Sequence, residues 1–337
     1  MRSRYLVELL LERVHDRTTR GQLQGALDDC RLACVVAQRV PDSEAGLGGS
    51  RDLLILARAH WANALRIAQR PEAAEAIFAS LLAHVSEMVV PSMEAEVLSF
   101  AASLRIVQQR YDEALGLLQR ELAIHKLLAD DHLQGRALVQ IARAQFGRGE
   151  TRRAIETARA SLLQIDVAEH RDLLAAVHNL ARYLEAADET LEAAELLEKY
   201  RSLYEEFSSD VWLRGRFFWL QARILERRGE SQASEVAFRQ ARRHFLDHDI
   251  AYSAALATVD LAKLLLEQGR FKEVQTLAEE SADVLHEGAL HGYASEAFDL
   301  FRQAALAEAL SVAELMRIAD YLRRAERDPG LRFTGVS

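Results

Sequence analysis

The 337-residue chain is poor in residues that interrupt helices, with 4 prolines and 16 glycines. Runs of β-branched residues bounded by turn residues are nearly absent, so a β-sheet is not expected. No stretch approaches the roughly 20 apolar residues that a transmembrane helix needs. The apolar segment near the amino terminus is broken by Glu8 and Glu12, so a secretory signal is not expected either. The sequence therefore predicts a helical protein of the cytoplasm.

The chain also has few cysteines and no excess of positive charge. Two cysteines, Cys30 and Cys34, are too few for a disulfide framework. The formal net charge of -9 argues against direct nucleic-acid binding, because phosphates favour clustered positive charge. The glycine-rich segment 46–49 lacks the lysine and the preceding strand of a nucleotide-binding loop, so it is interpreted as a linker. No cofactor is expected.

What the chain has in abundance is helix-forming residues arranged with a period of about 40. The residues that end the helix-joining turns are spaced 40, 40, 39, 41 and 40 apart: Pro71, Tyr111, Thr151, Thr190, Ser231 and Phe271. Nine residues before each lies an alanine: Ala62, Ala102, Ala142, Ala181, Ala222 and Ala262. Three residues after each lies a second row of small or short side chains: Ala74, Ala114, Ala154, Ala193, Ser234 and Val274. Packed helices lie roughly 8–10 Å apart, so their closest approach requires small side chains.

This period predicts eight antiparallel helical hairpins. Pro71 and Pro91 mark helix starts, and Ser311 with Glu314 forms a capping-box pattern. Glycines mark the ends of first helices at Gly149, Gly229 and Gly269. The expected division is a capping hairpin over 1–40, a loop over 41–50, repeats over 51–327 and a tail over 328–337.

The repeats resemble the tetratricopeptide family. Trp61-Ala62 and Leu261-Ala262 are similar to its large-small pair in the first helix, and Tyr111-Asp112-Glu113-Ala114 to the opening of its second helix. The resemblance implies an all-α, right-handed superhelical solenoid whose first helices line a concave face. The period of 40 instead of 34 is similar to that of bacterial regulatory and sensor proteins. An output arm, if the chain is such a sensor, would lie on another chain.

By the same resemblance, the residue after each first-helix alanine faces the groove. That row ends in four basic residues: Asn63, Ser103, Arg143, Arg182, Arg223 and Lys263. Further candidates on the same face are Arg136, Gln140, His178, Asn179, Arg216 and Trp219. The row favours a groove for an acidic or extended peptide, because arginine offers two parallel donors to a carboxylate. The alternative is a set of ordinary solvated helix positions. The family's carboxylate clamp for chaperone tails is not reproduced, since Asn63 is its one matching residue type.

Three residue pairs suggest chemistry and are better explained otherwise. Cys30 and Cys34 share a helical face but fit the apolar pattern, so buried core thiols are expected. His244 and His248 are four residues apart but lack the glutamate of a zinc protease motif. A third pair, His286 and His291, flanks a turn. No metal site is predicted.

The sequence thus predicts a scaffold or adaptor that binds a peptide or protein in a basic groove and is not an enzyme. The alternative is a peptide-responsive regulatory sensor that acts on a separate output protein. A third candidate, an enzyme, would need a metal or a catalytic constellation that the spacing does not reveal. No membrane partner is expected, and the oligomeric state is not predicted.

Overall fold

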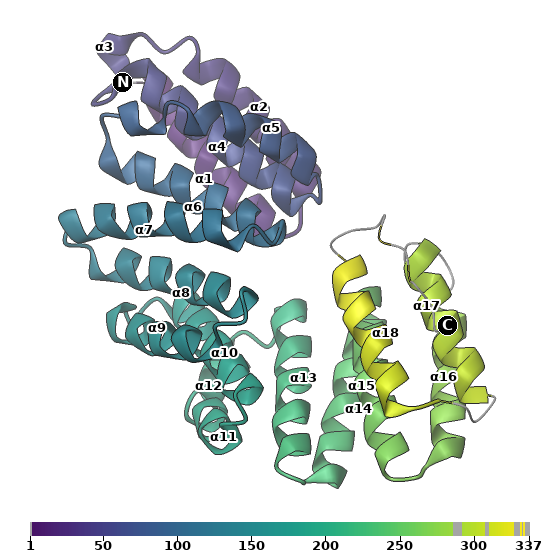
Figure 1. The fold of residues 1–337 in the computed structure, drawn as a ribbon. Helices are drawn as coiled ribbons and strands as arrows, with labels where there is room; N and C mark the ends of the chain where they lie inside the picture. Colours follow the sequence, from purple (N-terminus) through teal and green to yellow (C-terminus); the bar gives the residue numbers. More distant parts are fainter. Residues whose placement is uncertain (1, 286–291, 307–309, 327–330, 332, 334–337) are drawn as a thin grey trace. The chain divides into compact units, whose positions relative to one another are not determined.

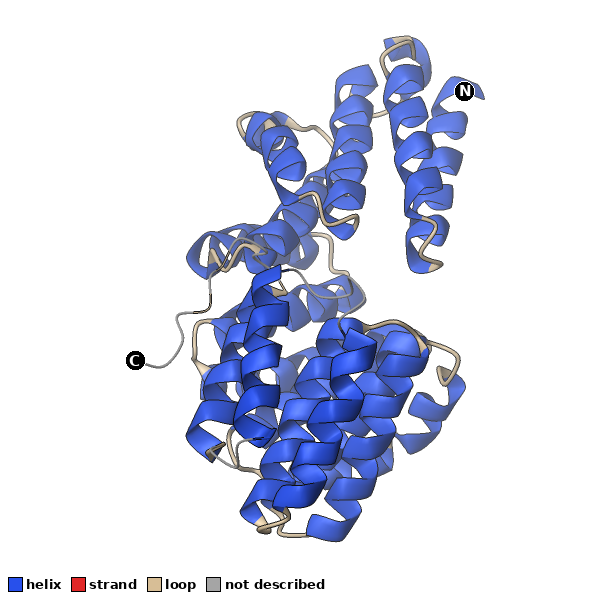
Figure 2. Ribbon diagram, turned by 90° about the vertical axis from the view of Figure 1, so that its right-hand side faces the viewer, coloured by secondary structure: helices blue, strands red, loops and turns tan. Residues whose placement is uncertain are grey.

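The computed structural model describes residues 2–285, 292–306, 310–326, 331 and 333, and among these every regular element is a helix (Figures 1 and 2). The chain divides into two compact units, Met1–Asn179 and Leu180–Ser337, and each is described by itself. None of the described helices is long and apolar enough to cross a lipid bilayer.

The first unit is a stack of helical hairpins. Its elements are α1 (Arg2–Thr19), α2 (Leu23–Ala37), α3 (Asp42–Ala45), α4 (Gly49–Ile67), α5 (Pro71–Leu82), η1 (Val85–Glu87), α6 (Pro91–Val107), α7 (Tyr111–Leu127), α8 (Asp131–Gly147), α9 (Thr151–Gln164) and the larger part of α10 (His170–Ala186). α1 pairs with α2, α4 with α5, α6 with α7 and α8 with α9 (Figure 1). The first helices α4, α6 and α8 also pack on one another in sequence.

The second unit continues the pattern. It contains the end of α10, α11 (Thr190–Lys199), α12 (Arg201–Glu206), α13 (Val211–Arg227), α14 (Ser231–Asp247), α15 (Ala251–Glu267), α16 (Phe271–Leu285), α17 (Gly292–Leu306) and α18 (Val312–Ala325). α13 pairs with α14, α15 with α16 and α17 with α18. The second helix of one hairpin is split at Tyr200 into α11 and α12, a break that the sequence did not predict.

The two small rows lie where the helices of a hairpin touch. All six first-helix alanines, from Ala62 to Ala262, are fully buried. The second-helix row from Ala74 to Val274 is buried as well. Ser234 Oγ donates a hydrogen bond of 2.9 Å to the carbonyl oxygen of Ala222, which joins the two rows directly. The expectation that small side chains mark the closest approach of paired helices is confirmed.

The turns that end the first helices share one backbone conformation. The residue two before each second helix has a positive φ: Gln69 (57°), Gln109 (60°), Gly149 (85°), Asp188 (67°), Gly229 (76°) and Gly269 (71°). Glycine adopts this left-handed region without strain, so the three glycines fit their predicted role. The expected capping box of Ser311 and Glu314 is present at the start of α18, and Pro71 and Pro91 open α5 and α6.

Candidate functional site

The predicted binding row lies on first helices in both units. Asn63 is on α4, Arg136 and Arg143 on α8, and Lys263 on α15. His178, Asn179 and Arg182 are on α10, and Arg216, Trp219 and Arg223 are on α13. Arg136 and Arg216 are exposed, His178 is buried, and the others are half-buried. The structure therefore divides the row into parts with different surroundings.

In the first unit, two arginines from different hairpins, Arg66 and Arg143, interact electrostatically. Arg66 is three residues after Asn63 on α4, and its Nε and Nη2 donate to Asn63 Oδ1 at 3.0 and 2.8 Å. Burial lowers the pKa of the Arg66 guanidinium, and the nearby positive charge of Arg143 lowers it further. A guanidinium stays charged in proteins, so this shift indicates mainly a desolvated cation, with a second positive charge in its surroundings.

Arg66 was missed by the sequence prediction. It falls outside the row that directly follows the small alanines, because it is four residues after Ala62. On a helix, residues three and four apart are neighbours, so extending the row by one turn would have found it. Asn63, Arg66 and Arg143 together form what is called here the arginine pair site.

Arg136 is engaged in an ion pair within the same unit. Its Nε lies 3.4 Å from Asp172 Oδ2, and His132 Nε2 lies 3.3 Å from the same oxygen. Asp172 is in the first turn of α10, so this group joins α8 to the start of the next first helix. Part of the positive charge expected for a groove is therefore balanced locally.

In the second unit, carboxylates three residues further along the helices pair with the basic row. Arg223 Nη2 lies 2.9 Å from Glu185 Oε2, and Glu185 is only 1% exposed. Lys263 Nζ lies 2.9 Å from Glu226 Oε1. Each pair joins a basic residue to the first helix of the preceding hairpin. The sequence prediction did not include these carboxylates. They place a negative charge beside Arg223 and beside Lys263, so the positive charge of these two residues is balanced within the second unit.

Trp219, the expected aromatic anchor, contributes to packing. Its ring meets Phe245 edge to face at a centroid distance of 6.1 Å. Its Nε1 donates to Asp260 Oδ2 at 2.8 Å, a bond between α13 and α15. The half-buried ring thus joins neighbouring hairpins.

The other candidate chemistry takes ordinary structural roles. Burial raises the pKa of Cys30 to about 12 and that of Cys34 to about 11, so neither thiol is ionised near neutral pH. His244 Nε2 lies 2.8 Å from the carbonyl oxygen of Val211, and His248 Nδ1 lies 2.8 Å from that of His244. Within the described residues, no group of three potential ligands is arranged to hold a metal ion. His286 and His291 lie outside the described residues.

Comparison with known proteins identifies the fold. No family model matches the chain, and no curated protein matches it significantly. A Rap protein complexed with competence and sporulation factor matches with a TM-score of 0.67 at 12% identity, over 96% of this chain and 88% of its own. The apo form of the quorum sensor NprR from B. thuringiensis gives 0.62 at 14% identity, over 89% and 80%.

A third match is a Rap conjugation gene regulator of the plasmid pLS20, in complex with the Phr* peptide. Its TM-score is 0.52 at 11% identity, over 97% of this chain and 86% of its own. At such identities the likeness shows the fold, and the chain has a tetratricopeptide-like helical-repeat fold. The predicted fold class, a solenoid of antiparallel helical hairpins, is confirmed.

Proposed function

We propose that the chain is a binding protein for an extended peptide and recognises an acidic group of that peptide at the arginine pair site. The observation that carries the proposal is the buried guanidinium of Arg66 on α4, which is held by Asn63 and feels the positive charge of Arg143 on α8. A desolvated guanidinium with a second positive charge in its surroundings is stabilised by an anion that hydrogen-bonds to it. The role proposed is that of an adaptor that works by binding and not by catalysis.

The chemistry of the three side chains favours a carboxylate. Asn63 accepts from two nitrogens of Arg66 and thereby fixes the plane of its guanidinium. A fixed guanidinium offers its remaining N–H groups as parallel donors, which match the two oxygens of a carboxylate. Asn63 also has an amide NH2 group, which can donate to a peptide carbonyl. Together these groups would read one acidic residue, or the terminal carboxylate, of an extended chain.

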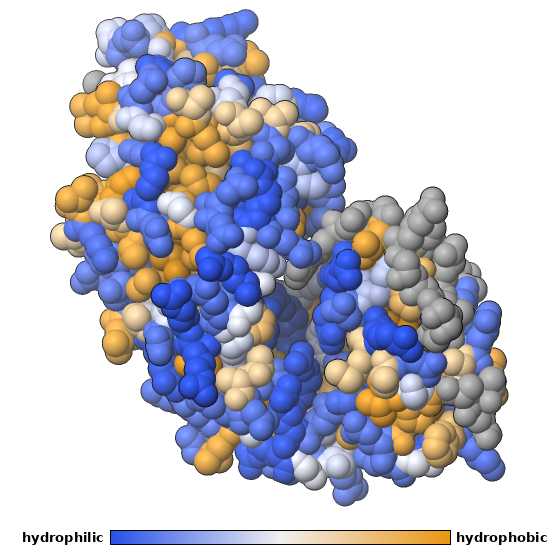
Figure 3. Space-filling view, viewed as in Figure 1, coloured by the Kyte–Doolittle hydropathy of each residue, from blue (hydrophilic) through white to orange (hydrophobic). Residues whose placement is uncertain are grey.

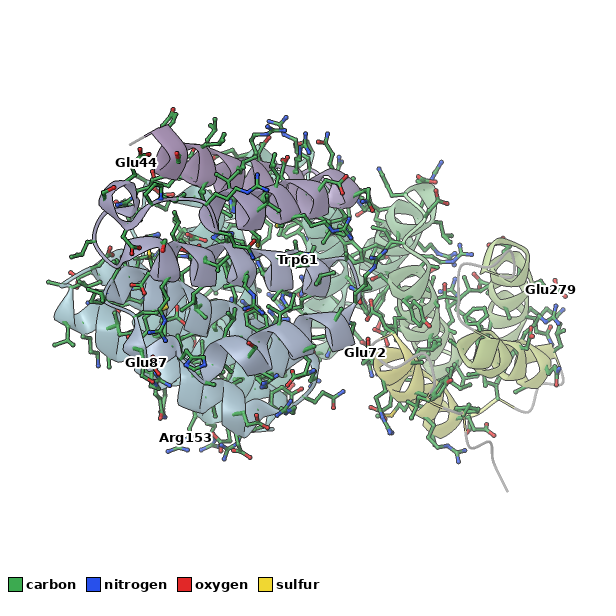
Figure 4. All side chains as sticks on the ribbon, turned by 90° about the horizontal axis from the view of Figure 1, so that it is seen from above. Glu44, Trp61, Glu72, Glu87, Arg153 and Glu279 are labelled. Atoms are coloured by element: carbon green, nitrogen blue, oxygen red, sulfur yellow. The ribbon has the colours of Figure 1, made fainter. Side chains whose placement is uncertain are left out.

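A positional library of fluorescein-labelled hexapeptides tests the proposal. We expect peptides with aspartate or glutamate to be enriched among those that bind the full chain. Arg66→Gln and Arg143→Gln should each weaken the best acidic peptide about tenfold or more, because a hydrogen bond to a charged group contributes roughly 1.5–3 kcal/mol. The matched control is Arg153→Gln on α9, which Figure 4 shows at the margin of the first unit, and it should bind as the wild type does. A library without acidic preference, or two variants with unchanged affinity, would disprove the site.

The second candidate role is that of a peptide-responsive regulator with its output on another protein. It is favoured by the long-period repeats and by the similar solved structures, of which one is a complex with competence and sporulation factor and another a complex with the Phr* peptide. Both roles share the same peptide-binding step. They differ in whether the peptide changes the shape of the protein, which a solution measurement can distinguish.

A further inference from the structure

Large apolar side chains are exposed along one edge of the first unit. Each connection from a second helix to the next first helix carries one: Leu47 (70% exposed), Val89 (58%), Leu128 (45%) and Val167 (74%). Their spacing in the chain is 42, 39 and 39 residues, which is the hairpin period. Figure 3 shows apolar surface at several places along this side, where the connection between α7 and α8 lies. These four residues are called the apolar edge row.

The apolar edge row does not contribute to the hydrophobic core, because other residues of the connections do so. Three of the connections also carry a buried apolar residue: Val40 before Leu47, Met88 beside Val89 and Ile165 before Val167. Leu127 and Leu163, at the ends of α7 and α9, are 87% and 89% exposed and extend the apolar surface. Single exposed apolar residues are ordinary, but a contiguous patch in a soluble protein marks an interaction surface. Recurrence on four consecutive connections therefore indicates a partner.

The repeat distance of the row matches an α-helix. The first helices α4, α6 and α8 pack side by side, and packed helices lie roughly 8–10 Å apart. Seven residues of an α-helix advance about 10.5 Å. If a partner helix lies across the connections, every seventh residue of that helix, about two turns apart, would therefore face the next connection in the row.

The charge of the residues along this edge indicates the charge of the partner. Asp42, Glu87, Asp166 and Glu169 are exposed on the same connections. Arg39 is the one exposed arginine or lysine on these four connections. A basic partner is therefore favoured, whereas a second copy of this chain would bring one acidic edge against another.

We propose that the apolar edge row docks an amphipathic helix of a partner protein, with leucine-like residues at heptad spacing flanked by lysine and arginine. The interaction is separate from the arginine pair site, because the row lies on the connections and that site lies on the first helices. Helix-in-groove recognition of this kind depends on a few apolar anchors. The chain would then hold a peptide on one surface and a protein helix on another.

A pair of synthetic helices tests the spacing. The probe is a fluorescein-labelled 28-residue peptide with leucine at every seventh position and lysine or arginine beside each leucine. The comparison peptide has the same composition with leucine at every fifth position, which places the leucines around the helix instead of in one stripe. We expect the full chain to bind the heptad probe at least ten times more tightly than the comparison peptide. Equal binding of the two peptides would overturn the proposal.

Variants of the edge test the location. The double variant Leu128→Gln and Val167→Gln should weaken the heptad probe about tenfold while its helical circular dichroism stays unchanged. The control is the double variant Leu191→Gln and Met316→Gln, at residues exposed to 65% and 60% on α11 and α18, and it should bind normally. Arg66→Gln should also bind the probe normally, so failure of this proposal and failure of the peptide site are distinguishable. Unchanged binding by the edge variant would overturn the proposal, as would a concentration-dependent dimer that the edge variant abolishes.

Discussion

Single residues show how closely the hairpins pack, and the helical glycines are the clearest case. Gly116 in α7 has open space around it, because an added Cβ would meet nothing within 4 Å. It faces a polar hollow of about 400 Å³ between α7, α8 and α9. Gly135 in α8 has none, since an added Cβ would lie 2.9 Å from the backbone nitrogen of Ile165. A side chain could therefore be added at Gly116, whereas close packing against the next connection requires glycine at position 135.

The two glycines give a prediction about stability. We expect Gly116→Ala to raise the free energy of unfolding by about 0.5–1 kcal/mol, because alanine loses less backbone entropy in a helix. Gly135→Ala should lower it, because the backbone of Ile165 would have to move. Urea denaturation followed by circular dichroism measures both. A loss of stability in Gly116→Ala would show that the hollow is tighter than the structure indicates.

The turns show which residue properties can be predicted from the sequence. Gly149 predicts a left-handed residue at the end of a first helix. Gln109 occupies the same position with a φ of 60°, and nothing about glutamine predicts it. The cost of the left-handed region for a residue with a side chain, roughly 1–2 kcal/mol, is offset by packing elsewhere in the hairpin. Only the alignment of repeats reveals that the two turns are equivalent.

At the scale of the helices, arginine–glutamate contacts repeat between second helices. Arg110, just before α7, lies 3.3 Å from Glu75 on α5. Arg270, just before α16, donates to Glu235 on α14 at 3.2 Å. Both contacts span 35 residues, so they occupy equivalent positions in their hairpins. Such contacts add specificity to the stacking of consecutive hairpins.

Glu75 gives a prediction about pH. Burial raises the pKa of Glu75, but hydrogen bonds from Arg105 and Arg110 outweigh burial and hold it below its ordinary value. A carboxyl whose pKa is lower in the folded state stabilises the protein above its unfolded pKa of about 4.3. That contribution is lost as the pH falls through the lower, folded pKa. We therefore expect Glu75→Gln to show a weaker loss of melting temperature below about pH 5 than the wild type.

The control for this measurement is Glu72→Gln, which changes an exposed carboxyl one turn earlier on α5. Its melting temperature should follow the wild-type pH dependence. Identical acid sensitivity of Glu75→Gln and the wild type would contradict the assigned role of the contacts with Arg105 and Arg110.

The candidate site could be predicted only in part at this scale. The position after each small alanine correctly selects residues of the first helices. The partners of those residues come from the neighbouring hairpin, as Glu185 does for Arg223 and Glu226 for Lys263. Spacing within one helix does not indicate such contacts, whereas the 40-residue period does when applied to carboxylates. The split between α11 and α12 has no comparable signal in the sequence.

At the scale of the whole molecule, the adaptor and the regulator make different predictions. If the chain is a regulator, the best acidic hexapeptide should reduce its radius of gyration, because a ligand favours the conformation that it binds best. Small-angle scattering with and without the peptide measures this change. Arg66→Gln should show none at the same peptide concentration. A radius that stays constant at saturation would identify an adaptor and contradict regulation by shape.

The contact between the two small rows also restricts how such a chain can vary in length over evolution. One residue inserted within a helix rotates all following side chains by about 100°, which would move the small residues away from their partner helix. Gain or loss of a complete hairpin preserves every interface, because Ala222 and Ser234 have equivalents in the other repeats. Relatives of this protein should therefore differ in size by multiples of about 40 residues, or in the connections between helices.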